Sequence, residues 1–301
     1  MIYGLDVGGT KIEIAIFNDE MVQVDSWRTQ TPQHDYTAFL DTLVNLIEEA
    51  DKRFNSKGII GLGMPGLIDA SGKSFCANIP AANSHDVIAD LSAKLGRPVT
   101  CENDCLALSE ANGGAGEGHH TVYGAIIGTG AAGGFTIGRT LLKSRQGIAG
   151  EYGHLQLPAA LQQKHDLPIR PCGCGLNGCF EGYISGPGLL YLHSHFDGPF
   201  RNVPAIVGAW RNGESTATET MTCYLDILGA SFATLVMSYD PDIIVLGGGI
   251  SLIEEVMEKL PSAIQNHLFS QFTAPPIVRA QYGDSSGVRG AAILARQHHV
   301  Q

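Results

Sequence analysis

Three cysteines and one histidine in this 301-residue chain have the spacing of a metal site. Cys172, Cys174 and Cys179 fall within eight residues that include three glycines, and His154 lies eighteen residues before the first cysteine. Three thiolates and one imidazole form the closed tetrahedral set that structural Zn²⁺ takes in proteins. The sequence therefore predicts a zinc knuckle with these four ligands. The alternative is a loop that carries three free buried thiols.

A first glycine-rich turn begins in a strand-like run and ends at a lysine. Its residues are Gly4, Leu5, Asp6, Val7, Gly8, Gly9, Thr10 and Lys11. The backbone N–H groups of such a turn can cradle a polyphosphate, while the carboxylate would meet phosphate only through Mg²⁺ or its water shell. An ordinary Gly-Gly hairpin is the alternative interpretation.

A second turn consists of Gly128, Thr129, Gly130, Ala131, Ala132, Gly133 and Gly134. It matches the dinucleotide-binding pattern G-x-G-x-x-G, which requires a helix to begin at the turn. The residues that follow, 135–137, favour a strand, so we predict a second phosphate-binding hairpin instead. A third glycine run includes Gly248 and Gly249, between a buried strand and a helix, where the base or ribose of a nucleotide could lie close to the backbone.

Acidic and amide side chains near these turns are suited to accept hydrogen bonds from a sugar. Glu151 and Glu181 flank the cysteine loop, so a loop fixed by metal would hold two carboxylates at a defined separation. Asn103 and Asp104 follow an expected strand over 98–101, and ligands of α/β proteins bind where strands end. Asn and Asp are also preferred at helix N-caps, which is the alternative for this pair.

Composition narrows the class of protein. The net charge is -11, and the 19 lysines and arginines are scattered, so we expect neither a nucleic acid nor a membrane surface as partner. The first residues enter a strand pattern without the features of an export signal, and we expect no apolar run near the length of a membrane span. Seven cysteines then favour reduced thiols or a metal site in a cytoplasmic protein.

Hydrophobic periodicity places these motifs on two similar modules. A hairpin over 2–7 and 11–17 opens the chain, and a second hairpin over 123–127 and 135–137 repeats it. The other expected elements are helices over 36–54, 88–95, 223–237, 252–260 and 288–297, with strands over 59–64 and 242–246. We therefore expect a duplicated α/β fold with two domains around a cleft, one formed by 1–112 plus 287–301 and the other by 113–286.

Taken in chain order, these motifs resemble the ROK group of repressors, open reading frames and sugar kinases. The motifs are Asp6-x-Gly-Gly-Thr-Lys, Glu102-Asn-Asp104, Gly128-Thr-Gly130, Glu151-x-Gly-His154 and Cys172-x-Cys174-Gly-x-x-Gly-Cys179-x-Glu181. The resemblance covers nearly the whole chain. It implies the actin-like ATPase (ribonuclease H-like) fold, with ATP and Mg²⁺ bound across the two glycine turns, a structural Zn²⁺ and a homodimer.

Within that family, the stretches 76–82 and 287–292 look most like bacterial N-acetylglucosamine kinases. The resemblance implies ATP-dependent phosphorylation of N-acetyl-D-glucosamine to its 6-phosphate, with Asp104 as general base. It also implies that His154 ligates zinc through one nitrogen and binds sugar through the other. The sugar contacts that it implies are Asn78, Asn103, Asp104, Glu151, His154 and Glu181.

Other functions stay open on the same scaffold. A glucose, fructose or mannose kinase is one, because an acetamide pocket has no sequence signature. A sugar-binding protein with impaired catalysis is another, because the family usually has Ala-Asn after the catalytic Asp and this chain continues directly with Cys105. A repressor of the family would begin with a helix-turn-helix, whereas the hairpin here begins at Ile2.

Overall fold

The computed structural model describes every residue except 70, 77, 104, 143–144, 146 and 300–301. Its internal contacts divide the chain into two units. The first contains Met1–Glu117, Arg139–Ala149 and Asp284–Gln301, and the second contains Gly118–Gly138 and Gly150–Gly283. The first unit is therefore discontinuous and needs the C-terminal segment for its completion.

A five-stranded mixed sheet with the order β3-β2-β1-β4-β7 forms the first unit. Neighbouring strands from β1 to β3 are antiparallel, as the Gly8-Gly9 turn predicted for the first pair, whereas β4 runs parallel to β1 and β7 runs parallel to β4. The strands are β1 (Ile2–Val7), β2 (Lys11–Phe17), β3 (Gln23–Gln30), β4 (Ile59–Gly63) and β7 (Val99–Glu102), and β5 (Leu67–Ile68) pairs separately with β6 (Ser74–Phe75).

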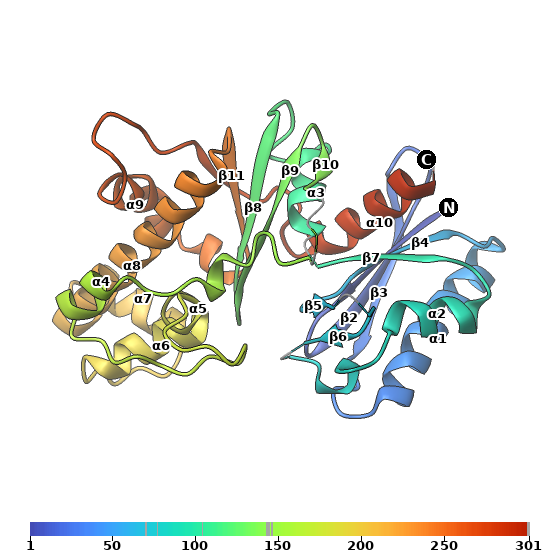
Figure 1. Cartoon of the computed structure of the whole chain (residues 1–301), viewed down its shortest axis with the longest axis horizontal. Coiled ribbons are helices and arrows are strands. Elements are labelled where there is room, and N and C mark those ends of the chain that lie inside the picture. Colours follow the sequence, from blue (N-terminus) through green and yellow to red (C-terminus); the bar gives the residue numbers. More distant parts are fainter. Residues whose placement is uncertain (70, 77, 104, 143–144, 146, 300–301) are drawn as a thin grey trace. The chain divides into compact units, whose positions relative to one another are not determined.

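One face of this sheet carries the apolar core of the unit. Tyr3, Leu5 and Val7 alternate along β1 and are buried against α1 (Tyr36–Phe54) and α2 (Val87–Leu95), which lie on that side in Figure 1. The predicted helix over 36–54 is confirmed. Asp35 begins it, because its carboxylate accepts a hydrogen bond from the Ala38 amide at 3.0 Å.

The opposite face is covered by α10 (Ser286–His299), which approaches the strands unusually closely. Glycines make this possible, because a Cβ on Gly4 would lie 1.9 Å from the Val288 carbonyl oxygen, and a Cβ on Gly61 would lie 1.8 Å from the Ala291 carbonyl oxygen. The short helix α3 (Cys105–Ala111) packs against α10. The glycines of β1 and β4 therefore allow α10 to lie directly on the backbone of these strands.

The second unit repeats the pattern of the first. Its sheet has the order β10-β9-β8-β11-β12, and β8 is antiparallel to β9 and parallel to β11, as β1 is to β2 and β4. This repeat confirms the predicted duplication of an α/β module. The strands are β8 (Thr121–Ile127), β9 (Ala131–Ile137), β10 (Thr140–Leu141), β11 (Ile243–Gly247) and β12 (Ile277–Arg279).

A long apolar helix forms much of the core of the second unit. α8 (Ser215–Tyr239) is long and apolar enough to cross a membrane, which corrects the expectation that no segment approaches that length. Of the most apolar 18 residues of this helix, 67% are buried inside the protein, as expected for a core helix. The other helices are α4 (Ala159–Lys164), α5 (Glu181–Ile184), α6 (Gly186–His195), α7 (Val203–Arg211) and α9 (Glu254–Gln265).

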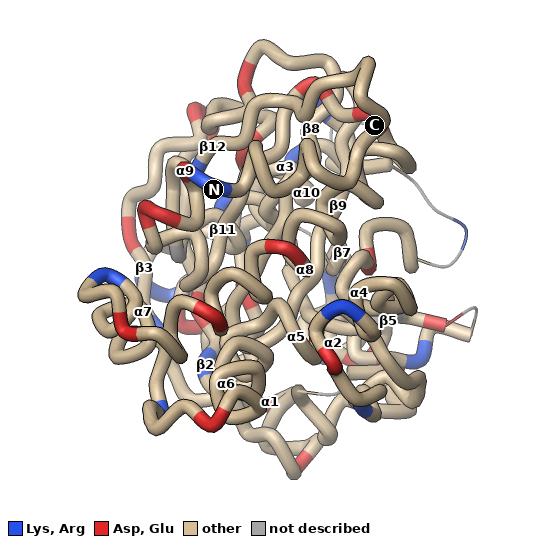
Figure 2. Tube along the Cα trace, turned by 90° about the vertical axis from the view of Figure 1, so that its left-hand side faces the viewer, with Lys and Arg blue, Asp and Glu red and all other residues tan. Residues whose placement is uncertain are grey.

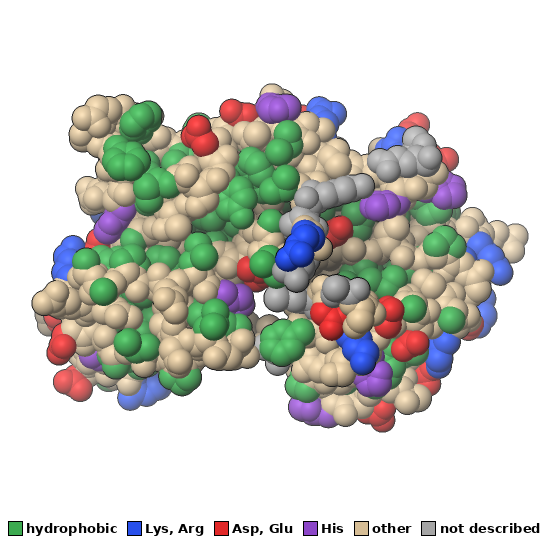
Figure 3. All heavy atoms as spheres, in the orientation of Figure 1, with side chains coloured by type: hydrophobic (Ala, Val, Ile, Leu, Met, Phe, Trp, Pro, Cys, Tyr) green, Lys and Arg blue, Asp and Glu red, His purple; other side chains and the backbone are tan. Residues whose placement is uncertain are grey.

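Charged side chains are spread along both units. Figure 2 shows lysines and arginines interspersed with aspartates and glutamates along the trace, and Figure 3 shows side chains of both charges on one face. Several of the described basic residues are paired with a carboxylate, for example Arg53 with Glu49 and Arg211 with Glu255. Positive charge is therefore locally neutralised on these surfaces.

Candidate active site

The four predicted metal ligands lie together in the second unit. The ligand atoms of His154, Cys172, Cys174 and Cys179 all lie within 4.8 Å of one another. The Cys174 and Cys179 sulfurs are 3.7 Å apart, and the Cys172 sulfur is 3.6 Å from His154 Nδ1. A tetrahedral site with Zn–S bonds of ~2.3 Å and a Zn–N bond of ~2.0 Å has S–S edges of about 3.8 Å and S–N edges of about 3.5 Å. The donor set therefore fits Zn²⁺.

The cysteine loop is folded by its own backbone hydrogen bonds. The Cys172 amide donates to the Leu176 carbonyl at 2.9 Å, and the Gly178 amide donates to the Arg170 carbonyl at 2.7 Å. Gly175 and Gly178 have φ angles of 90° and 73°, a region that glycine enters without strain. Burial raises the pKa of the Cys179 thiol above its usual value, so a cation is needed to hold it as thiolate.

Glu181 connects the cysteine loop to the second glycine turn. It begins α5 directly after Cys179 and Phe180, and its Oε2 accepts a hydrogen bond from the Ala131 amide at 2.9 Å. A Cβ on Gly130 would lie 2.7 Å from the same oxygen, so only glycine leaves room for this carboxylate. The structure therefore places a predicted sugar-binding carboxylate against a predicted phosphate turn.

Glu151 lies next to His154, one of the four metal ligands. They are joined by a short 3₁₀ turn over Tyr152–His154, and His154 Nε2 lies 3.8 Å from a Glu151 carboxylate oxygen. Because Nδ1 of this imidazole faces the sulfurs, Nε2 is directed toward the carboxylate. The binding of sugar by Nε2 stays a prediction.

The second glycine turn is a hairpin. Gly128 donates to the Gly130 carbonyl at 2.9 Å, and β9 then begins at Ala131. The strand confirms the rejection of a dinucleotide-binding helix at this turn. The Gly128 carbonyl also accepts from the Gly186 amide at 2.8 Å, which brings the start of α6 to the turn.

An apolar pocket of about 540 Å³ opens beside this turn. It is lined by Gly128 and Thr129 of the second glycine turn and by Gly249 of the third glycine run, and their contact with a nucleotide stays a prediction. Gly248 lies at the end of β11, where a Cβ would lie 2.4 Å from the Ile127 carbonyl oxygen. The other walls could not be predicted from sequence and come from α6, α7 and the turn before α9: Gly186, Pro187, Val203, Pro204, Val207, Arg211, Ile250, Leu252 and Ile253.

The first glycine turn is held by bonds within the first unit. The Gly8 amide donates to the Lys11 carbonyl at 2.8 Å, and the Thr31 hydroxyl donates to the Gly8 carbonyl at 2.7 Å. A Cβ on Gly9 would lie 3.1 Å from the Asn78 Cβ, so this predicted sugar contact lies against the turn.

Predicted site residues also gather at the carboxyl ends of parallel strands in the first unit. In the register of the sheet, Asp6 pairs with Gly63, and Gly63 pairs with Glu102. Asp6 and Asn103 therefore lie at the same edge of the sheet, where these parallel strands end. Ligands of α/β proteins bind at such edges. The predicted general base, Asp104, lies outside the described residues, between Asn103 and the start of α3 at Cys105.

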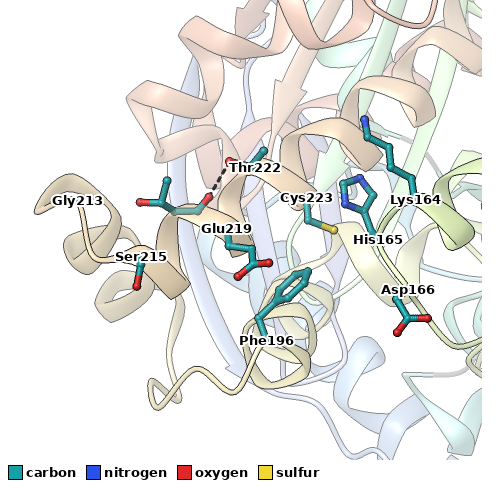
Figure 4. A pocket seen from close by; sticks show the side chains of 10 residues that line it. Lys164, His165, Asp166, Phe196, Gly213, Ser215, Glu219, Thr222 and Cys223 are labelled. Atoms are coloured by element: carbon teal, nitrogen blue, oxygen red, sulfur yellow. Dashed lines mark hydrogen bonds between the residues drawn. The ribbon is translucent and has the colours of Figure 1, made fainter.

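A second hollow of about 650 Å³ contains none of the predicted site residues. Figure 4 shows Lys164, His165 and Asp166 on one side of it, and Glu219 and Cys223 of α8 on the other. Burial raises the pKa of the Cys223 thiol to about 12, so this thiol is a poor nucleophile at neutral pH.

One carboxylate beside this hollow accepts three charged or polar hydrogen bonds. The carboxylate of Asp226 accepts hydrogen bonds from Lys164 Nζ and His165 Nε2, each at 2.7 Å, and from His267 Nε2 at 2.8 Å. Burial alone would raise the pKa of Asp226, but these three hydrogen bonds outweigh it and lower the pKa to about 2. The described residues meet the spacing of a metal group only around His154, so we interpret the Asp226 group as structural.

Comparison with known proteins gives one consistent result. The ROK family matches residues 2–298. The chain is 45% identical over 296 residues to the N-acetylgalactosamine kinase AgaK of Shewanella sp. (98% of this chain, 96% of that one), and 40% identical over 300 residues to the N-acetyl-D-glucosamine kinase of Haemophilus influenzae (98% and 99%).

Solved structures agree with these relatives. The ROK hexokinase from Thermus thermophilus superimposes with a TM-score of 0.86 at 30% identity, covering 99% of both chains. A ROK family glucokinase from Streptomyces griseus, solved in complex with glucose and AMPPNP, gives a TM-score of 0.80 at 28% identity, covering 98% of this chain and 99% of that one. The duplicated fold described above is thus the actin-like ATPase fold.

Proposed function

Because this chain belongs to the ROK family, we propose that it transfers the γ-phosphoryl group of ATP to the 6-hydroxyl of N-acetyl-D-glucosamine. The chain is a sugar kinase of that family, and the acceptor is the part that is proposed. The observation that supports this acceptor is the 40% identity to a relative named N-acetyl-D-glucosamine kinase, and the bond from the Ala131 amide to Glu181 supports the site because it joins the predicted phosphate turn, a predicted sugar-binding carboxylate and the metal knuckle.

Each part of the group has a role in this reaction. Zn²⁺, held by His154 and the three cysteines, would fix the loop in which Glu181 begins its helix. Glu181 and Glu151 would accept hydrogen bonds from sugar hydroxyls and orient the acceptor. Asp6 would hold the phosphates through Mg²⁺, which neutralises their charge.

The expected chemical step is phosphoryl transfer from ATP to an alcohol. The sugar oxygen attacks the γ-phosphorus, the bond from that phosphorus to the bridging oxygen breaks, and ADP leaves. Asp104 accepts the hydroxyl proton, and because its carboxylate is a weak base the transfer runs late and contributes about 10²- to 10⁴-fold. Positioning of the two substrates supplies most of the rate.

N-acetyl-D-galactosamine is the second candidate acceptor, because the relative with 45% identity is named for that sugar. The two sugars differ only in the configuration at carbon 4, which a few hydrogen bonds distinguish. Glucose, fructose and mannose kinases of the family are further alternatives. We expect the enzyme to act in the cytoplasm as a homodimer, which its mass by light scattering would test.

A panel of sugars with ATP tests the proposal. We expect the highest kcat/KM for N-acetyl-D-glucosamine, with the product identified as the 6-phosphate by mass spectrometry and NMR. A higher kcat/KM for N-acetyl-D-galactosamine would transfer the assignment to that sugar. Absence of ADP release with every sugar, in a folded protein that binds one of them, would instead support a sugar-binding protein with impaired catalysis.

The Asp104→Asn variant tests the general base. It should retain the fold and the affinity for sugar, since the amide keeps the size of the carboxylate, but should lose turnover by the factor given above. Near-normal kcat in the variant would reject the assignment. Wild-type protein purified in parallel, with equal sugar affinity by calorimetry, is the control.

A further inference from the structure

The walls of the 540 Å³ pocket point to the kind of nucleotide that it takes. We infer that this kinase accepts purine and pyrimidine triphosphates with little selectivity, because the pocket binds the flat faces of a base rather than its hydrogen-bonding edge. Arg211 is the residue that stacks on the base, through the face of its guanidinium group. The inference rests on the proposed function, since it takes the pocket as the site of the phosphoryl donor's base.

The side chains of the pocket offer few hydrogen bonds. Of the twelve described residues that line it, ten are glycine, proline, valine, leucine or isoleucine, and only Thr129 and Arg211 carry polar side-chain atoms. Adenine and guanine differ at their edges, where one has a donor and the other an acceptor. A site that distinguishes them strongly needs fixed polar partners, whereas an apolar pocket separates similar ligands by only about 10- to 200-fold.

The backbone at the pocket walls is largely engaged elsewhere. α6 and α7 each have a proline as second residue, Pro187 and Pro204, which has no N–H to offer, and the Gly186 amide that begins α6 donates to the Gly128 carbonyl. The next free amides of these helices are capped, because Ser185 accepts from the Gly188 amide at 3.1 Å and Asn202 accepts from the Ala205 amide at 2.9 Å.

The third wall is closed in the same way. In the turn after β11, the Ser251 amide donates to the Gly248 carbonyl at 3.1 Å, and the Ile253 amide donates to the Ile250 carbonyl at 3.1 Å. Arg279 Nε donates to the Ser251 carbonyl at 2.7 Å. These groups are thus committed to the turn, which contributes Gly249, Ile250, Leu252 and Ile253 to the pocket wall.

Arg211 is held with its plane fixed. Its Nε and Nη2 donate to the two oxygens of Glu255 at 2.6 and 2.9 Å, so the last turn of α7 is joined to the first turn of α9 by a bidentate pair. In such a pair the bonds lie in the plane of the guanidinium and do not use its faces. A guanidinium face stacks on any base, because every base has a π-face.

Kinetics with several nucleotides test the inference. At saturating sugar, kcat/KM would be measured for ATP, GTP, ITP, UTP and CTP by quantifying sugar phosphate with mass spectrometry, a readout that does not depend on the nucleotide. We expect all five to support turnover within about 200-fold of one another, with purines ahead of pyrimidines because their stacking area is larger. A preference for ATP above about 1,000-fold would overturn the inference.

Variants test the role of Arg211. Arg211→Ala should raise KM for ATP and GTP by similar factors, about 5- to 150-fold, with KM for sugar unchanged. Arg211→Lys should not restore KM, because an ammonium group has no planar face. Arg201→Ala, which removes an arginine bonded to the Gly198 and Phe200 carbonyls of the same unit, is the matched control. An effect of Arg211→Ala on one nucleotide alone would overturn the stacking role.

Calorimetry of ADP, GDP and UDP with the full chain separates this inference from the proposed function. Similar Kd values without any sugar phosphorylation would keep the inference and reject the sugar kinase reaction. Phosphorylation with ATP, accompanied by binding of ADP and no binding of GDP or UDP, would reject the inference and keep the reaction.

Discussion

Replacement of Glu181 by glutamine tests whether the contact between the glycine turn and the cysteine loop serves the sugar. One carboxylate oxygen accepts from the Ala131 amide, and the other lies 3.9 Å from the Cys172 sulfur. Under the proposed function, this second oxygen would accept a hydrogen bond from a sugar hydroxyl. A hydrogen bond to a charged group contributes about 1.5–3 kcal/mol. We therefore expect Glu181→Gln to lower kcat/KM for sugar by about 10- to 150-fold.

The assay measures initial rates against sugar concentration at saturating ATP, with the zinc content of each variant determined in parallel. Glu181→Asp keeps the charge but withdraws the carboxylate by one methylene, so it should lose activity as well. Glu219→Gln removes an exposed carboxylate of α8 in the same unit and should leave the kinetics unchanged. If both Glu181 variants retain full zinc and kcat/KM within twofold of wild type, Glu181 does not bind the sugar.

Three further predictions concern metal, pH and packing. Wild-type protein should contain one zinc per chain, and Cys174→Ser should lose it and melt at lower temperature; metal analysis and a thermal melt would show this, and full activity of a metal-free, folded sample would contradict it. Asp226, whose pKa of about 2 lies below its ordinary value of 3.8, should stabilise the fold above about pH 4 and lose that contribution between pH 4 and 2. Asp226→Asn should therefore lower the free energy of unfolding, measured with urea, by ~2 kcal/mol at pH 7 and by less at pH 2. An equal decrease at both pH values would contradict this prediction. Gly61→Ala should lower the free energy of unfolding by about 1–3 kcal/mol or more, because the new Cβ would overlap the Ala291 carbonyl. Gly208→Ala is the control and should not destabilise the protein, because there is open space around its Cβ.

The strands and helices that carry a strong local pattern could be predicted from the sequence. The first hairpin could be placed because the Gly8-Gly9 pair separates two apolar runs, and the helix over 36–54 has both an N-cap and a regular apolar stripe. The second hairpin was also predicted, but its return strand begins at Ala131 and not at residue 135, because Gly133 and Gly134 of β9 pair with β8. α8 begins at Ser215, eight residues before the predicted start, because its first two turns are rich in serine and threonine and lack an apolar stripe. α9 continues to Gln265 through Pro261, where the sequence pattern indicated an end.

The candidate site could be predicted from the sequence only where residue types and their spacing are specific to one kind of site. Cysteine spacing identifies the metal group, because few other arrangements need three thiols in eight residues. The walls of the apolar pocket could not be predicted, since Val203 and Ile250 are ordinary core residues by type, and only the fold brings α6, α7 and the turn after β11 together. The contact of Glu181 with Ala131 was likewise invisible, because it joins residues fifty positions apart.

The way in which α10 lies on the first sheet has a consequence for synthesis of the protein. During translation, β1 to β7 leave the ribosome long before Ser286, and until then the strand face around Gly4 and Gly61 has no cover. The first half of the nascent chain must therefore wait, with an exposed apolar surface, while the whole second unit is made. A chain cut short before α10 should be captured by chaperones or aggregate rather than fold in part.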